Sequence, residues 1–137
     1  MKKNGFFVGM CLVLGLWATG CAGGRHAVLP CDVAYVVLSV DGRATQRDAR
    51  PDITFASDGR VFGWTGCNRY FGQYVSQGSD VEVVGSLGMT RMYCHNRAEQ
   101  EQVFVRGIQQ VGTFEVKGRR LILTTDQGVK IEGVRAK

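Results

Sequence analysis

Residues 60–75 read RVFGWTGCNRYFGQYV, a pattern of two strands on either side of a polar corner. The runs 60–64 and 69–75 are rich in aromatic and β-branched residues, which favour extended structure. Between them, residues 65–68 are of the types that turns prefer. Asn68 can adopt a left-handed backbone and bond its own main chain, so we predict that it shapes a turn rather than binds a ligand.

Strand signals continue on both sides of this stretch. Residues 53–55 lead into 60–64 through the hairpin turn Ser57-Asp58-Gly59. Further strands are predicted at 33–40, 81–84, 113–117, 120–125 and 129–134, each next to a turn that contains glycine. With 137 residues, 45% hydrophobic and 21% charged, the chain has room for one ordinary domain. Its length excludes a (β/α)₈ barrel enzyme and a two-domain dehydrogenase.

One helix is predicted, from Asn96 to Gly112. Asn96 is placed to cap the first turn, and Glu99 three residues later completes a capping-box pattern. Apolar residues recur at helical spacing and predict a face that packs on a sheet: Phe104, Ile108 and Val111. We therefore expect an α+β domain, a small antiparallel sheet of about eight short strands packed with a single α-helix.

The first 20 residues have the features of a signal peptide. Lys2 and Lys3 precede an apolar run over residues 6–17. As a helix this run would be roughly 18 Å long, short of the about 30 Å of a bilayer core. Ala18-Thr19-Gly20-Cys21 follows. Small residues before a cysteine resemble the bacterial lipobox, in which that cysteine is acylated and becomes the first mature residue.

This resemblance divides the chain into three parts. We expect a lipoprotein signal peptide at residues 1–20, an acylated tether at 21–32 with the lipid on Cys21, and a domain at 33–135. In lipoproteins of the enterobacterial type, aspartate after the cysteine retains the protein at the inner membrane. Ala22 stands there instead, which implies the outer membrane, facing the periplasm. The alternative is ordinary cleavage beside small residues, with no lipid.

The net charge of +5 is not gathered into a basic stripe interleaved with aromatic residues, so nucleic acid is not an expected partner. The densest basic patch, Lys117-Gly118-Arg119-Arg120, lies at a predicted hairpin turn, where such charges are usually just solvated. An anionic membrane would gain from basic residues only if they were held near its headgroups. We expect a monomer that is attached to the membrane by its acyl chain and has no cofactor.

Two segments together resemble the META domain family, which includes the heat-inducible HslJ-type lipoproteins. They are GWTGCNRYFGQY at residues 63–74 and LGMTRMYC at residues 87–94. The resemblance covers about residues 33–134 and departs from the family pattern at Tyr35, often Trp, and at Cys31, which the pattern does not supply. It implies a small antiparallel sheet curved around one helix, an envelope location and a role in envelope maintenance under stress. It identifies no ligand.

The cysteines leave several pairings open. Cys67 and Cys94 belong to the two family-like segments and are candidates for a disulfide in an oxidising compartment. Their loop of roughly 28 residues would then contribute about 3.5 kcal/mol of stability. Cys31 is the alternative partner for either residue, and free thiols remain a third option.

Most aromatic residues near the corner should be core, while Trp64, Tyr70 and Tyr74 are candidates for an exposed contact surface.

Signals for catalysis and metal binding are weak. A zinc site would have to use Cys67, Cys94, His95 and His26, which lack the paired short spacings of such sites. Neither histidine lies in a recognisable nucleophile motif. We therefore expect a non-enzymatic envelope lipoprotein that supports envelope maintenance or stress tolerance through protein contacts. One alternative is a small-molecule or lipid-binding module with a cavity between sheet and helix. The other is an inhibitor of an envelope hydrolase that uses the loop at residues 43–52.

Overall fold

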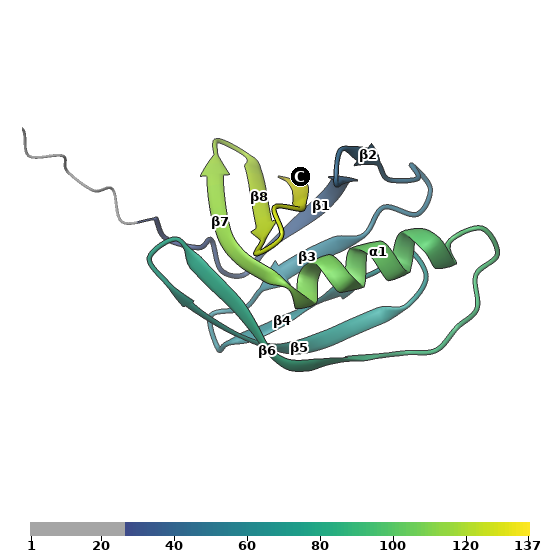
Figure 1. The fold of residues 1–137 in the computed structure, drawn as a ribbon, viewed down its shortest axis with the longest axis horizontal. Helices are drawn as coiled ribbons and strands as arrows, with labels where there is room; N and C mark the ends of the chain where they lie inside the picture. Colours follow the sequence, from purple (N-terminus) through teal and green to yellow (C-terminus); the bar gives the residue numbers. More distant parts are fainter. Residues whose placement is uncertain (1–26) are drawn as a thin grey trace, which may run out of the picture.

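The structure, a computed structural model, describes residues 27–137. These residues contain a single short helix and nine strands, of which Figure 1 labels the helix and the first eight strands. In chain order they are β1 (Val33–Val40), β2 (Arg43–Ala44), β3 (Asp52–Phe55), β4 (Arg60–Trp64), β5 (Arg69–Gln77), β6 (Asp80–Met89), α1 (Ala98–Gln109), β7 (Val111–Lys117), β8 (Arg120–Thr125) and β9 (Lys130–Arg135).

Eight of these strands close into an antiparallel β-barrel. β1 pairs with β3 on one edge, from Val33↔Phe55 onwards, and with β9 on the other, from Tyr35↔Arg135 to Val40↔Ile131. β2 is an extra strand beside the end of β1. The predicted fold class, an α+β domain with a curved sheet packed around a helix, is therefore wrong, because the fold is a closed and mostly β barrel. The alternation within each strand does not show that the first and last strands meet.

The helix is shorter than predicted and starts differently. It begins at Ala98 with Arg97 as the N-cap, and no side chain caps it. Asn96 lies before the helix with a left-handed backbone (φ 61°). The predicted capping box of Asn96 and Glu99 is thus wrong.

The helix packs on the barrel between β6 on one side and β1 and β9 on the other. It connects β6 to β7, which share one ladder pair, Asp80↔Thr113. Phe104 and Ile108 of α1 are fully buried and join the same apolar cluster as the barrel strands. Gly107 brings the helix close to β9, since a Cβ there would lie 2.8 Å from Cδ1 of Ile131.

The space inside the barrel is filled by side chains. The largest fully buried side chains are aromatic: Tyr70, Phe55 and Phe104. Phe104 packs edge-on against Tyr70, with ring centroids 5.7 Å apart. These core side chains occupy the interior of the barrel, so the hollows beside the helix in the described residues are open to the surface. Within residues 27–137, no helix has the length and apolarity needed to cross a membrane.

The register defines two ends of the barrel. At the entry end β1 begins, and the hairpin turn at residues 56–59 lies beside it because Val33 pairs with Phe55. The turn at residues 117–120 and residues 135–137 reach the same end, since the backbone N–H of Arg135 bonds the Arg119 carbonyl and that of Ala136 bonds the Ala34 carbonyl. At the opposite, corner end lie the turn at residues 65–68 and the segment after β6.

Candidate functional site

The two family-like segments meet at the corner end. Cys67 and Cys94 form a disulfide, with their Cα atoms 5.9 Å apart. Cys31 is the free cysteine of the described residues, and its Sγ lies 3.3 Å from the hydroxyl of Tyr74. The structure thus contains the Cys67–Cys94 pairing and neither alternative with Cys31. Cys21, the predicted lipid attachment site, lies outside the described residues.

Asn68 is the polar centre of this corner. It is only 2% exposed, and its side-chain oxygen accepts hydrogen bonds from the Met92 backbone N–H (2.6 Å) and the Thr90 hydroxyl (3.0 Å). Its amide nitrogen donates to the Met92 carbonyl and to both carboxylate oxygens of Glu101. The predicted structural role of Asn68 fits this geometry. Its side chain bonds residues 90–92 and Glu101 rather than its own main chain, and its backbone is not left-handed, so the turn is closed by Thr65 and Gly66 instead.

Glu101 ties α1 to the same corner. Its carboxylate accepts a hydrogen bond from the hydroxyl of Thr65, which is fully buried. The same hydroxyl oxygen accepts the backbone N–H groups of Cys67 and Asn68 and so closes the turn. Gly66 is required between them because its φ is +99° and a Cβ would lie 2.4 Å from the Ala49 carbonyl oxygen. Sequence reasoning missed Glu101, which carries no local signal beyond being acidic in the first helical turn.

Asp52 lies beside the corner on the outer wall. One of its carboxylate oxygens accepts the backbone N–H of Trp64 at 3.2 Å. Burial raises the pKa of Asp52, while the Trp64 bond and the nearby Arg69 charge oppose this shift. A Cβ on Gly63 would meet the Asp52 carbonyl oxygen at 2.2 Å, so glycine lets the two strands approach this closely.

The three aromatic residues predicted to form a contact surface do not share a face. Tyr70 is buried, donates its hydroxyl to the Asp52 carbonyl and has its pKa raised by burial, so that part of the prediction is wrong. Tyr74 also points inward, where its ring packs edge-on against Phe55 at 4.9 Å. Burial raises its pKa, as does its hydrogen bond with Cys31. Only Trp64 lies on the outer face, half-buried.

An exposed apolar stripe runs over the outer face of β4, β5 and β6. Phe62 pairs across the strands with Phe71, which is 61% exposed, and Val75 and Val84 extend the same face. We call these four residues, together with Trp64, the outer stripe. Phe71 lies directly over Gly88, where a Cβ would come within 2.4 Å of its ring. A Cβ-free position in β6 therefore lets this ring lie flat on the strand.

Two open depressions lie at the corner end, and the outer stripe reaches one of them at Trp64 beside Cys67. One, of about 530 Å³, is lined by Trp64, Arg69 and Met92 among others. The other, of about 470 Å³, lies on the far side of the segment at residues 90–93. Met92 lines both depressions and is 66% exposed, and Tyr93 beside it is 83% exposed. This end of the wall thus offers apolar side chains beside shallow hollows.

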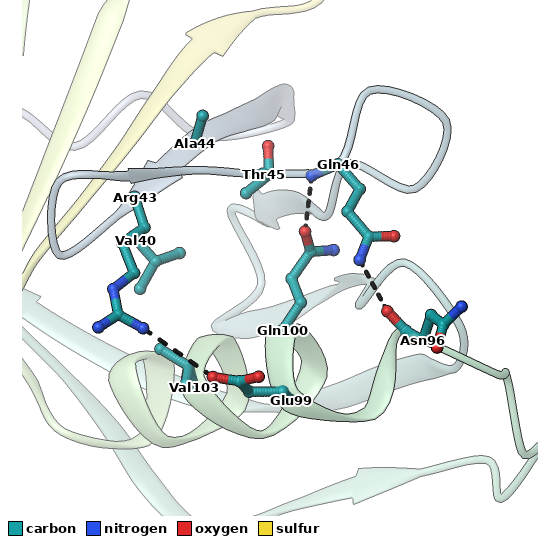
Figure 2. Close-up of a pocket in the computed structure, with 9 residues that line it drawn as sticks. All are labelled: Val40, Arg43, Ala44, Thr45, Gln46, Asn96, Glu99, Gln100 and Val103. Carbon is teal, nitrogen blue, oxygen red and sulfur yellow. Dashed lines mark hydrogen bonds and ion pairs between the residues drawn. The ribbon is translucent and has the colours of Figure 1, made fainter.

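A further groove, of about 200 Å³, separates α1 from the segment at residues 43–46 (Figure 2). Figure 2 shows hydrogen bonds across it: Gln100 Oε1 accepts the Gln46 backbone N–H, and Gln46 Nε2 donates to the Asn96 carbonyl, both at 2.7 Å. Gln100 Nε2 also donates to the Ala49 carbonyl. The loop at residues 43–52, proposed for hydrolase inhibition, is therefore bonded along α1.

Among residues 27–137, no group of three or more His, Cys, Asp or Glu side chains converges as a metal site would require. The arrangement at the corner is a disulfide surrounded by satisfied hydrogen bonds. It holds three segments together and presents the outer stripe beside them.

These features define a small antiparallel β-barrel with a disulfide-linked polar corner. The META domain family model matches residues 29–137, so the chain belongs to the META domain family. No curated protein matches the sequence.

Three solved structures share the fold. The chain is similar to a protein from Burkholderia xenovorans solved by NMR, with 24% identity, a TM-score of 0.63 and coverage of 81% of this chain and 94% of that one. A second NMR structure has 24% identity, a TM-score of 0.60 and coverage of 74% and 88%. A crystal structure of a DUF4847 family protein from Bacteroides vulgatus has 12% identity, a TM-score of 0.59 and coverage of 77% and 93%. At these identities the likeness concerns the fold alone.

Proposed function

We propose that this META-domain protein is a non-enzymatic lipoprotein of the bacterial envelope. In this proposal Cys21 is acylated, the barrel faces the periplasm from the outer membrane, and the protein supports envelope maintenance or stress tolerance by contacting another envelope protein. Family membership and the signal-like features of residues 1–21 support the anchor and the location. The Cys67–Cys94 disulfide also suits a compartment in which disulfides persist.

The outer stripe is the single observation that carries the contact role. Phe62, Phe71, Val75 and Val84 are all exposed on one wall, although the barrel core behind them is filled. Contiguous exposed apolar surface is costly to leave in water and typically marks an interaction site. The barrel interior, where a small molecule or lipid could be enclosed, is filled by core side chains, and this favours the contact role over the binding module.

The anchor is tested by metabolic labelling with radioactive palmitate, followed by separation of the inner and outer membranes. We expect the wild type to carry the label and to sediment with the outer membrane. The Cys21→Ser variant should lose the label and leave the membrane fraction. Equal fractionation of both proteins would overturn the lipoprotein proposal.

The contact role is tested by site-specific photo-cross-linking in living cells. A cross-linking residue is placed at Phe71 in one protein and at Ile122 in the control, since Ile122 is an apolar residue on β8 that is only half-buried. We expect a discrete protein adduct from position 71 and none from position 122. Adducts of equal yield from both positions, or none from position 71, would contradict a partner on the outer stripe.

A further inference from the structure

A second surface lies at the entry end of the barrel. The sequence places Lys117, Arg119 and Arg120 at one turn, and the structure brings two more basic residues to it from the end of β9. Arg135 donates its backbone N–H to the Arg119 carbonyl at 2.8 Å, and Nη2 of Arg119 donates to the Arg135 carbonyl at 3.0 Å. Lys137 follows two residues later. All five are exposed, and we call them the basic cluster.

The basic cluster concentrates the positive charge of the described chain. It contains five basic side chains, and Glu115, which pairs with Lys117 at 3.3 Å, is the acidic side chain among them. The rest of residues 27–137 carries nine basic and eleven acidic side chains. The basic cluster is therefore a net positive patch at the entry end, which also carries Asp32 and Asp58, whereas the described residues outside the cluster have a slight excess of negative charge.

The tether enters the barrel next to this cluster. Tyr35 pairs directly with Arg135, and Asp32 precedes Tyr35 by three residues, so the entry point lies about 15 Å or less from Arg135. Asp32 is held in place because its backbone N–H bonds the Phe55 carbonyl and its carboxylate accepts the Ser57 N–H. From Cys21 to Asp32 the chain can span at most about 40 Å.

We propose that the basic cluster is a membrane-docking face, which binds the anionic phospholipid headgroups of the membrane that holds the acyl anchor. This orientation rests on the proposed acylation of Cys21. Each basic residue near an anionic surface strengthens binding roughly fivefold, and the effect decays within about 8 Å at physiological salt. A short tether keeps the cluster close to the headgroups, so a weak interaction suffices to orient the domain. The corner end and the outer stripe then remain free for a protein partner.

The docking face is tested with the mature chain that begins at residue 21 and carries Cys21→Ser, so that no acyl chain contributes. Residues 27–137 form the closed barrel and contain its core, so removal of the signal segment leaves the fold intact. Co-sedimentation is measured with vesicles that contain phosphatidylglycerol and with vesicles of phosphatidylcholine alone. We expect binding only to the phosphatidylglycerol vesicles, and weaker binding as salt is raised.

Two charge-reversal variants locate the surface. Arg119→Glu with Arg120→Glu should weaken binding by roughly 25-fold or more, because two contributing cations are replaced by anions. Arg91→Glu with Lys130→Glu changes the net charge equally at the corner end and should leave binding within about twofold of wild type, since both residues lie beyond the screening length from the membrane. Circular dichroism confirms that each variant is folded.

The outcomes separate this inference from the proposed function. Equal binding to both kinds of vesicle, or equal loss in the two double variants, would overturn the docking face. Palmitate labelling without selective vesicle binding would support the lipoprotein proposal and refute the docking face. Selective vesicle binding without palmitate labelling would support the docking face and refute the lipoprotein proposal.

Discussion

Asn68 shows how one buried amide can join three segments of a chain. Its side chain satisfies the backbone N–H and carbonyl of Met92, the hydroxyl of Thr90 and the carboxylate of Glu101. Truncation would break these part-buried hydrogen bonds, and a polar group left unpaired and shielded from water costs about 1–3 kcal/mol.

We expect Asn68→Ala to lower the free energy of unfolding by about 2–4 kcal/mol. Urea unfolding followed by tryptophan fluorescence measures this change. Gln127→Ala, an equivalent truncation in an exposed turn, is the control and should stay within about 0.5 kcal/mol of wild type. An Asn68→Ala protein as stable as the control would show that the corner is not held by this amide.

Asp52 gives a prediction about pH. Burial raises its folded-state pKa above that of the unfolded chain, so the folded protein binds the proton more tightly. Ionised Asp52 therefore costs stability at neutral pH, and the cost disappears as the pH falls through the folded pKa. Asp52→Asn should keep the acceptor for the Trp64 N–H and remove this cost.

We expect Asp52→Asn to stabilise the protein at pH 7 by a few tenths of a kcal/mol, because the half-exposed charge is partly screened. The gain should shrink in thermal unfolding as the pH falls below the folded-state pKa of Asp52, and it should vanish once the pH is also below the pKa of this residue in the unfolded chain. A gain that grew as the pH fell would mean that the folded-state pKa is lowered rather than raised.

The aromatic residues of the corner show what single positions reveal in a sequence. In RVFGWTGCNRYFGQYV aromatic side chains occur on both faces of the two strands, so the alternation predicts the strands without saying which face is inside. In the structure Phe71 lies on the outer face and Tyr70 on the inner face, although Tyr70 was predicted to belong to the exposed contact surface. The deciding contact, Phe71 over Gly88, joins residues that no local pattern connects.

Among the elements, strands were easier to predict than the helix start. The runs predicted at 33–40, 60–64 and 120–125 match β1, β4 and β8. β6 extends from Asp80 to Met89, whereas the sequence predicted a strand only over 81–84. The prediction stopped too early because the strand is irregular there: Gly85 has a positive φ, and the register with β5 shifts opposite Gly72. Such an irregularity breaks the alternation on which strand prediction depends.

At the start of the helix, tertiary hydrogen bonds outweigh the local capping signal in the sequence. Asn96 and Glu99 have capping-box spacing, yet Asn96 is left-handed and Glu99 makes only an exposed contact of 3.9 Å with Arg43. Glu101 instead bonds Thr65 and Asn68. We expect Glu101→Ala to cost about 2–3 kcal/mol, since buried donors lose their acceptor.

The matched control is Glu99→Ala, which should cost less than about 0.5 kcal/mol because exposed ion pairs contribute little. Denaturant unfolding of the two variants under identical conditions measures the difference. If Glu99→Ala proved the more damaging change, the capping box would be operating in solution and Glu101 would not anchor the helix.

The disulfide joins two further elements across the corner. Cys67 and Cys94 are 27 residues apart in sequence, and a loop of this size contributes about 3.5 kcal/mol by its effect on the unfolded chain. We expect Cys67→Ser with Cys94→Ser to lose about this much in denaturant unfolding. Wild type treated with reductant should lose the same amount and the double variant nothing more. A reductant effect that persisted in the double variant would point to Cys31 as the thiol involved.

At the scale of the whole molecule, closure of the barrel could not be predicted from the sequence. Each strand satisfies its own alternation, and nothing local distinguishes an open sheet from one in which residue 35 pairs with residue 135. Closure requires a particular tilt and stagger of all eight strands together. It also removes the free edges that an open sheet of this size would expose to aggregation.

Closure makes a prediction about where the fold opens. β1 is bonded on both edges, to β3 and β9, and Val37 in its middle is fully buried. β6 is bonded along β5 but shares a single ladder pair with β7. β2 has two residues and one neighbour. Local opening is easiest where backbone hydrogen bonds are few and exposed.

We therefore expect native-state hydrogen exchange to rank these strands. Amides of β1 should exchange only through global unfolding, with protection equal to the full free energy of unfolding, whereas those of β2 and of β6 near Gly85 should exchange through smaller openings. NMR exchange across a series of low denaturant concentrations measures both classes. Exchange of β1 at the rate of β2 would mean that the β1–β9 seam opens on its own and that the barrel is not closed in solution.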